Sequence, residues 1–248
     1  MTLLLGLPSK GRIFDDTSKW LEGIGLDLNR AVDSRVYRAN LDGIAGIEVR
    51  LASAGEIASS LDAGTIHAGV TGLDIIHERA GGISAFVLPL KGLGFSRARV
   101  VVAVPDAWLD VENMSDLVDV AVKHFERARS RLRVATKFRE LTRRFFAQKG
   151  IRDYRIVASQ GATEGAPAAG VAEFVVDITE TGATLAANQL RVLDDGLILD
   201  SQAVLAGSLA ATWTAQTVET FRQFMRLTGM DEERANMFAV AAAGTIKL

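Results

Sequence analysis

A loop of hydroxyl-bearing and small residues, Thr179 to Thr184, is the stretch of this sequence whose residue types most clearly suggest chemistry. The apolar run Phe174 to Val176 precedes it and ends on Asp177, and Leu185 to Asn188 has the character of a helix start. A strand, a short loop and a helix N-terminus present backbone N–H groups without intrahelical acceptors, and the helix dipole adds partial positive charge. Small residues let a phosphate approach, and threonine hydroxyls add donors. The loop is therefore a candidate phosphate site.

Two acids beside the loop need an explanation, because Asp177 and Glu180 would repel a phosphate that touched them. We expect them to face a ribose diol or a magnesium ion instead. The simpler alternative is that a strand-to-helix turn of this composition only connects the two elements and binds no ligand, as in many α/β proteins. The loop by itself leaves both interpretations open.

A longer pattern favours the phosphate interpretation. Ten residues at fixed spacing resemble the signature of the ATP phosphoribosyltransferase family, namely Glu164, Gly170, Ala172, Val175, Asp177, Ile178, Thr181, Gly182, Thr184 and Leu185. Six further segments look like family landmarks in the family's order: Lys10–Arg12, Asp33–Arg35, Gly69–Asp74, Leu93–Arg97, Arg133–Lys137 and Leu141–Phe146. The resemblance covers roughly residues 3–205.

The resemblance implies an α/β fold of two lobes with a central cleft, similar to periplasmic binding proteins of type II, followed by C-terminal helices. We expect residues 1–104 and 190–248 to form lobe I, including the helical tail. Residues 105–189 are expected to form lobe II, which carries the phosphoribosyl pyrophosphate loop. The implied reaction joins N1 of the adenine of ATP to C1 of phosphoribosyl pyrophosphate. It releases pyrophosphate and is the first step of histidine biosynthesis.

The resemblance also implies a set of substrate-binding residues. In lobe II these are Glu164, Asp177, Glu180, Thr181, Gly182, Ala183, Thr184 and Leu185. In lobe I they are Lys10, Gly11, Arg12, Arg35 and Asp74. The cations expected to stabilise the departing pyrophosphate are Lys10, Arg12, Arg35 and Arg97, together with Mg²⁺ carried by that group. Adenine N1 has its own lone pair, so no side-chain nucleophile is required and no general base is assigned.

Several of these assignments have a simpler alternative in which the residue binds no ligand. Lys10 and Arg12 also fit a solvated basic turn, and Arg97 also fits an exposed loop charge. Asp74 at a helix start favours the helix dipole whether or not it touches a ligand. The histidines His67, His77 and His124 lack metal-ligand spacing; we interpret the first as a strand residue and the others as surface residues.

Composition narrows the class of protein. The chain of 248 residues has a net charge of −2, which gives no global basic field for nucleic acid, and it has no cysteine. No stretch approaches the roughly 20 apolar residues of a membrane span, and no signal-like segment is present. We expect a cytoplasmic protein without membrane or nucleic-acid partners.

The tail after residue 205 looks too short for the regulatory domain of the family's long form. The chain therefore resembles the short form, which implies a regulatory partner related to histidyl-tRNA synthetase and a homodimer of catalytic subunits. Two competing hypotheses remain: a non-catalytic two-lobed binding or effector-sensing protein, and a phosphoribosyltransferase of the common type. The common type carries two adjacent acids before its phosphate loop, whereas here Asp177 and Glu180 are separated.

Local patterns predict most elements. Residues 3–7, 47–51, 66–70, 86–90, 100–104, 132–135 and 154–158 are predicted strands, as are 190–193 and 197–205. Ser53 to Glu56 reads as a capping box that opens a helix. Residues 27–42 are expected to be irregular and 106–119 to be a loop before a helix at 120–129. Two helices, 217–227 and 231–242, are expected at the end, with Asp231 as an N-cap.

Overall fold

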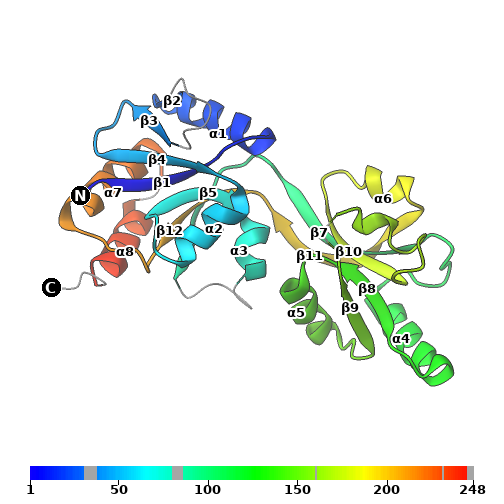
Figure 1. Ribbon diagram of the computed structural model, residues 1–248. Coiled ribbons are helices and arrows are strands. Elements are labelled where there is room, and N and C mark those ends of the chain that lie inside the picture. The colour runs from blue at the N-terminus through cyan, green and yellow to red at the C-terminus, as the bar shows by residue number, and fades with distance from the viewer. Residues whose placement is uncertain (31–37, 80–85, 160, 231, 245–248) are drawn as a thin grey trace. The chain divides into compact units, whose positions relative to one another are not determined.

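The chain divides into two compact units that it enters in alternation. The computed structural model of the protein describes all residues except 31–37, 80–85, 160, 231 and 245–248. Unit 1 comprises 1–96 and 202–248, and unit 2 comprises 97–201, so the chain crosses between them twice (Figure 1). Residues 97–104 and 190–201, expected in the first lobe, thus belong to the second, because their strands pair within its sheet.

Unit 1 is built on a seven-stranded sheet of order β2-β3-β4-β1-β5-β12-β6. Its central strand β1 is parallel to β4 and β5, whereas β12 is antiparallel to β5 and β6. The strands span Leu3–Pro8 (β1), Asp27–Arg30 (β2), Arg38–Asp42 (β3), Ile47–Ala52 (β4), Ala68–Gly72 (β5), Val87–Gly92 (β6) and Ala203–Ser208 (β12).

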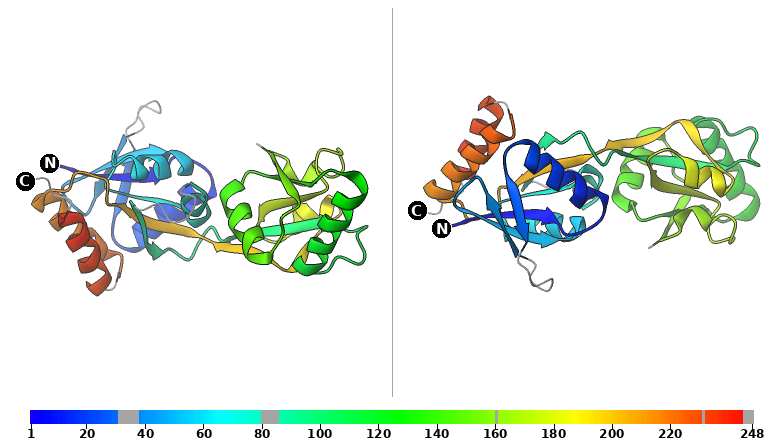
Figure 2. Two further views of the ribbon diagram at one scale, coloured as in Figure 1. Left: turned by 90° about the horizontal axis from the view of Figure 1, so that it is seen from below. Right: turned by 90° about the horizontal axis from the view of Figure 1, so that it is seen from above.

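Helices cover both faces of this sheet. They span Arg12–Gly23 (α1), Ala54–Asp62 (α2), Leu73–Arg79 (α3), Ala215–Leu227 (α7) and Glu232–Ala243 (α8). Leu3, Leu5 and Leu7 pack with Leu21 of α1 and Phe221 of α7 in one core cluster, which also holds Phe238 of α8. The opposite face of the sheet meets α2 and α3 through the cluster of Ile57, Leu61 and Ile76. Figure 2 shows the helices of unit 1 on the two sides of its strands.

Unit 2 has a five-stranded sheet of order β11-β7-β10-β8-β9. Its elements are β7 (Ala98–Pro105), α4 (Met114–Ala128), β8 (Leu132–Thr136), α5 (Arg139–Lys149), β9 (Tyr154–Ala158), a 3₁₀ turn (Thr163–Gly165), β10 (Phe174–Thr179), α6 (Ala183–Ala187) and β11 (Leu190–Ser201). Alternation along β10 sets its two faces. Phe174 and Val176 pack with residues of α4 and α5, and Val175 packs with Leu185 of α6 and Ala166.

One pattern recurs in both sheets. The strand that follows each crossing, β7 or β12, lies antiparallel between two strands of the unit that it enters. This double crossing is the arrangement of the type II periplasmic binding proteins. It confirms the predicted class of two α/β lobes, and α7 and α8 are the predicted C-terminal helices. Within the described residues no helix is long and apolar enough to cross a membrane.

Two segments differ from their predictions. Residues 27–42 were expected to be irregular, but Asp27–Arg30 and Arg38–Asp42 are antiparallel strands at the sheet edge. Their alternation is weak, since β3 buries only Ala39 and Leu41 among polar neighbours. The predicted loop 106–119 is also wrong in its second half, because α4 begins at Met114. Asn113 caps this helix and Asp116 completes a capping box. The acidic residues of this segment favoured the prediction of a loop instead.

Other expectations hold or shift slightly. The Ser53–Glu56 capping box is confirmed, with the Glu56 N–H donating to Ser53 Oγ at 3.3 Å and the Ser53 N–H donating to Glu56 Oε2 at 2.8 Å. The predicted strand 197–205 is divided at Gln202, where the chain crosses, and its first part continues β11 through a bulge. Asp231, the expected N-cap of α8, lies outside the described residues.

Candidate active site

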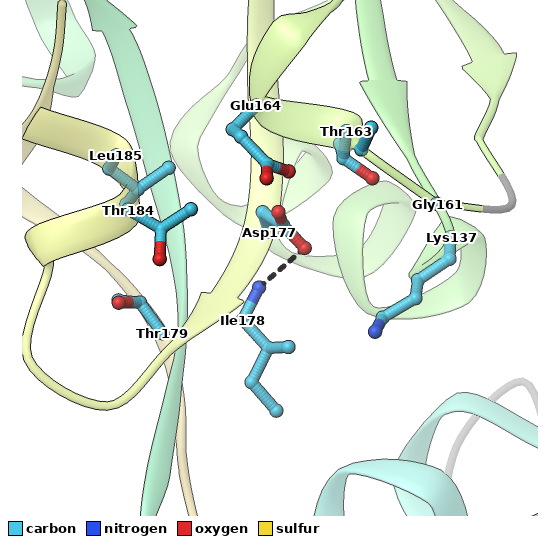
Figure 3. Close-up of a pocket in the computed structure, with 10 residues that line it drawn as sticks. Lys137, Gly161, Thr163, Glu164, Asp177, Ile178, Thr179, Thr184 and Leu185 are labelled. Atoms are coloured by element: carbon cyan, nitrogen blue, oxygen red, sulfur yellow. Dashed lines mark hydrogen bonds between the residues drawn. The ribbon is translucent and has the colours of Figure 1, made fainter. Parts of the chain in front are cut away.

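A pocket of about 270 Å³ lies in unit 2 where three neighbouring strands end. Strands β9, β8 and β10 are parallel, so their carboxyl ends meet at one edge, the usual position of ligands in open α/β sheets. Figure 3 shows the side chains around this space. The lining residues are Lys137, Gly161, Ala162, Thr163, Glu164, Asp177, Ile178, Thr179, Thr184 and Leu185.

Strand register explains why distant residues meet here. Val175 of β10 lies beside Ala135 of β8, and both strands run in the same direction. Lys137 directly follows β8, and Asp177 is two residues beyond Val175, so both lie near the same strand ends. Asp177 shares the sheet face of Val175, which is also the face that Leu185 covers. Both Lys137 and Asp177 therefore reach the pocket.

Asp177 has an unusual environment. Burial raises the pKa of its carboxyl, and the neighbouring carboxylate of Glu164 raises it further. A hydrogen bond from the Ile178 N–H, at 2.8 Å, and the charge of Lys137 oppose this effect without cancelling it. Figure 3 shows Glu164 and Asp177 next to each other, with Lys137 extending from the opposite side. Such a perturbed acid in a cleft is typical of a functional site.

The loop after β10 presents backbone donors. Gly182 is the N-cap of α6 with φ 83, in the left-handed region that favours glycine. Its N–H donates to Thr179 Oγ1 at 2.8 Å, which closes the loop. The first bond within α6 is Ala186 N–H to Gly182 O, so the N–H groups of Thr184 and Leu185 precede the helical ladder. Since α6 has only five residues, these donors matter more than its dipole.

The third side of the pocket follows β9. Thr163 is buried and donates from Oγ1 to Ser159 Oγ at 2.9 Å. Ala162 has φ 47, a left-handed conformation that is uncommon for a residue other than glycine. The sequence analysis included Thr179 in the candidate phosphate loop but gave no individual role to Lys137 or to residues 161–163. Lys137 was named within a landmark, but its closeness to Asp177 depends on the register of β8 and β10 and has no local signal.

The sequence-predicted residues of unit 2 separate into two groups. Glu164, Asp177, Thr184 and Leu185 come together around the pocket. Glu180, Thr181 and Ala183 are exposed and Gly182 is half-buried in the same loop, outside the lining. The strand and helix also extend further than predicted. β10 continues to Thr179 and α6 begins at Ala183, which shortens the loop to 180–182.

The predicted residues of unit 1 gather at its own strand edge. Lys10 and Gly11 follow β1 and Arg12 begins α1, all of them exposed. Asp74 lies in the first turn of α3, directly after β5. Since β1 and β5 are parallel neighbours, these residues share the carboxyl edge of the sheet. Arg97 is exposed at the start of unit 2, and Arg35 lies outside the described residues.

Two polar groups elsewhere serve the fold. His67, just before β5, is buried. Its Nδ1 accepts from the Leu4 N–H at 3.0 Å, and its Nε2 lies 3.2 Å from Thr212 O. Glu173 accepts from Arg133 Nε at 3.0 Å and from Nη2 at 2.6 Å, which joins β8 to the residue before β10. Among the described residues no group of three or more metal-ligating His, Cys, Asp or Glu side chains occurs.

Comparison with known proteins identifies the family of the chain. Residues 53–227 match the family model described as HisG: ATP phosphoribosyltransferase. The ATP phosphoribosyltransferase of Caulobacter vibrioides is 51% identical over 223 residues, covering 90% of this chain and 70% of the relative. That of Bradyrhizobium diazoefficiens is 53% identical over 219 residues, covering 88% of this chain and 67% of the relative.

A solved structure shares the fold. The ATP phosphoribosyl transferase (HisG:HisZ) complex from Thermotoga maritima superposes with a TM-score of 0.68 at 24% identity, covering 95% of this chain and 100% of that chain.

The fold and the pocket define a two-lobed α/β protein with hydroxyls, acids and a lysine at a strand edge. The chain belongs to the ATP phosphoribosyltransferase family. It is an enzyme, a glycosyltransferase of pentosyl transfer whose reaction is the first step of histidine biosynthesis. The alternative of a non-catalytic binding or sensing protein is not favoured.

Proposed function

We propose that the unit 2 pocket holds phosphoribosyl pyrophosphate while N1 of the adenine of ATP attacks C1 of the sugar. The observation that carries this proposal is that Thr184 and Leu185, which bring hydroxyl and N–H donors at the start of α6, line one pocket with Asp177 and Glu164. The donors suit the 5-phosphate and the two carboxylates suit the ribose hydroxyls. We assign to Glu164 the ribose contact that was expected of Glu180, because Glu164 and Asp177 line the same pocket.

The chemistry needs positioning more than acid or base. The N1–C1 bond forms as the C1–O bond to pyrophosphate breaks, and the electron pair of that bond leaves with pyrophosphate. Since N1 brings its own lone pair, no general base is assigned. The contribution of the protein is to align the two reactants and to stabilise the negative charge that develops on the leaving group.

Unit 1 supplies further candidate contacts. We include Lys10, Arg12 and Arg97 as cations for the leaving pyrophosphate and retain Arg35 on the sequence argument alone. Gly11 lies between Lys10 and Arg12 after β1, and we propose that its backbone N–H contacts a phosphate. Asp74 at the start of α3 is a candidate for a substrate hydroxyl. Support comes from the shared carboxyl edge of β1 and β5.

Magnesium is included as a cofactor that the substrate carries. The pocket offers two carboxylates, which are oxygen donors of the kind that Mg²⁺ accepts, so its chemistry fits the ion. When bound, Mg²⁺ neutralises part of the charge on the leaving group.

The assembly state is also part of the proposal. The Thermotoga maritima structure is a complex of HisG with HisZ, and its fold is that of this chain. We include a regulatory subunit related to histidyl-tRNA synthetase, a homodimer of catalytic subunits and the short form. If regulation belongs to that partner, histidine should not inhibit this chain alone. Clear inhibition of the isolated chain would argue against a separate regulatory subunit.

Product formation tests the function. Purified protein with ATP, Mg²⁺ and phosphoribosyl pyrophosphate should form N1-(5-phosphoribosyl)-ATP, followed as a rise in ultraviolet absorbance. A matched reaction with ribose 5-phosphate in place of the donor should give none, since it has no leaving group. Absence of product, even with the partner subunit added, would contradict the proposed function.

A further inference from the structure

We propose that Lys137 binds the pyrophosphate of the donor, at the end of the pocket opposite the 5-phosphate loop. This inference rests on the proposed function and adds a residue to it. Lys137 lines the pocket with the two acids, and it is the one positively charged side chain among the described lining residues. Without it, the lining residues would offer no positive charge to the pyrophosphate end of a polyanionic donor.

The backbone on both sides of Lys137 is fixed. Thr136 is fully buried, and its Oγ1 accepts from the Phe138 N–H at 2.9 Å. Phe138 is buried too, and its carbonyl accepts from Thr142 Oγ1 at 2.5 Å. Lys137 itself is exposed, with Nζ 5.0 Å from the centroid of the Phe138 ring. A backbone held by hydrogen bonds and an exposed side chain suit a residue that meets a charged ligand.

The order of groups across the pocket matches the order of groups in the donor. Thr184 and Leu185 lie on one flank, Glu164 and Asp177 in the middle, and Lys137 on the other flank (Figure 3). In phosphoribosyl pyrophosphate the 5-phosphate and the C1 pyrophosphate extend from opposite sides of the ribose, with the 2,3-diol between them. If the loop binds the 5-phosphate and the acids bind the diol, the pyrophosphate points to Lys137.

A cation at the position of Lys137 would also contribute to catalysis. Negative charge develops on the pyrophosphate oxygen as the C1–O bond breaks, and a fixed cation there stabilises the transition state. An ammonium contributes a point charge with three donors, which suits phosphate oxygens. Lys137 should therefore affect turnover as well as binding of the leaving group, whereas a structural lysine would affect neither.

Fragment binding separates this role from the others. We expect Lys137→Met to weaken binding of inorganic pyrophosphate about 10- to 100-fold, the range of a charge-assisted hydrogen bond. Binding of ribose 5-phosphate, which keeps the 5-phosphate and the diol, should change less than about 2-fold. Lys137→Arg should restore part of the pyrophosphate affinity. Both ligands are titrated by calorimetry against the full chain.

Arg139→Met is the matched control, because it removes an exposed positive charge near Lys137 but outside the pocket lining. It should leave both affinities unchanged. Unchanged pyrophosphate binding in Lys137→Met, or an equal loss of ribose 5-phosphate binding, would overturn the inference. The proposed function is judged separately by product formation in the wild-type chain, so either can fail while the other stands. Melting temperatures verify that each variant is folded.

Discussion

Glu164 and Asp177 line one pocket, where burial raises the pKa of the Asp177 carboxyl and the Glu164 carboxylate raises it further. Two acids side by side reduce the stability of a folded protein unless a ligand uses them. In a phosphoribosyl transferase the ribose diol is such a ligand, since its hydroxyls can donate to both carboxylates. Under the proposed function, the cost in stability and the binding of the ribose thus arise from the same two carboxyl groups.

Asp177→Asn should stabilise the free protein near neutral pH. Because the folded pKa is raised, the carboxyl favours folding below its unfolded pKa and loses that contribution as pH rises through its folded pKa. The amide removes the ionised form, so a gain of roughly 0.5–2 kcal/mol is expected at pH 7–8 and none near pH 3. Urea unfolding at both pH values measures it.

The same substitution should weaken ribose 5-phosphate binding about 10-fold or more, through loss of a charged acceptor. Asp106→Asn is the matched control, since that exposed acid lies outside the pocket and should show neither effect. A lower free energy of unfolding in Asp177→Asn at neutral pH would show that the ionised carboxylate does not destabilise the fold.

Thr184→Ala should weaken ribose 5-phosphate binding without unfolding the protein. The side chain is exposed and lines the pocket, so its removal costs a donor for the 5-phosphate and little packing. A loss of about 5- to 10-fold is expected for one hydrogen bond, measured by calorimetry. Thr65→Ala, which removes an exposed hydroxyl in unit 1, is the control.

Gly182→Val tests the conformation of the same loop. An added side chain meets no atom within 4 Å, so the effect must come from the backbone, which has φ 83. A β-branched residue there is strained by roughly 1–2 kcal/mol, which should shift the loop and weaken donor binding. Donor affinity that is unchanged in both Thr184→Ala and Gly182→Val would remove the phosphate role of the loop.

His67 should make unit 1 sensitive to acid. Burial lowers the pKa of its imidazole, and Arg50 lowers it further. Its Nδ1 accepts from Leu4 N–H, so the ring is neutral, and its stabilising contribution is lost as pH falls from its ordinary pKa through the lowered one. His67→Asn should flatten the fall in stability between pH 7 and 5 by on the order of 1 kcal/mol. An equally steep fall in stability between pH 7 and 5 in His67→Asn would contradict this assignment.

Chelation tests the proposal that the substrate carries the magnesium. Removal of Mg²⁺ with EDTA should abolish product formation, and restored Mg²⁺ should return it, while ribose 5-phosphate binding persists throughout. Titration of Mg²⁺ alone into the protein should show no tight stoichiometric site. A tight site without substrate would instead assign the ion to protein ligands.

Local sequence predicted most of the elements but not every contact of the site. The apolar run before Asp177 and the small-residue loop after it correctly predicted β10 and the turn that follows it, because strand and turn signals there are short-range. The edge strands β2 and β3 were missed since their polar residues give little alternation. Lys137 was not given a role because its position beside Asp177 arises from the pairing of β8 with β10.

The most direct test of the account is a crystal structure of the protein with ribose 5-phosphate. The account predicts the 5-phosphate on the N–H groups of Thr184 and Leu185, the diol on Asp177 and Glu164, and C1 directed toward Lys137. A sugar phosphate bound away from this pocket, or bound in it with the 5-phosphate at Lys137, would contradict the account.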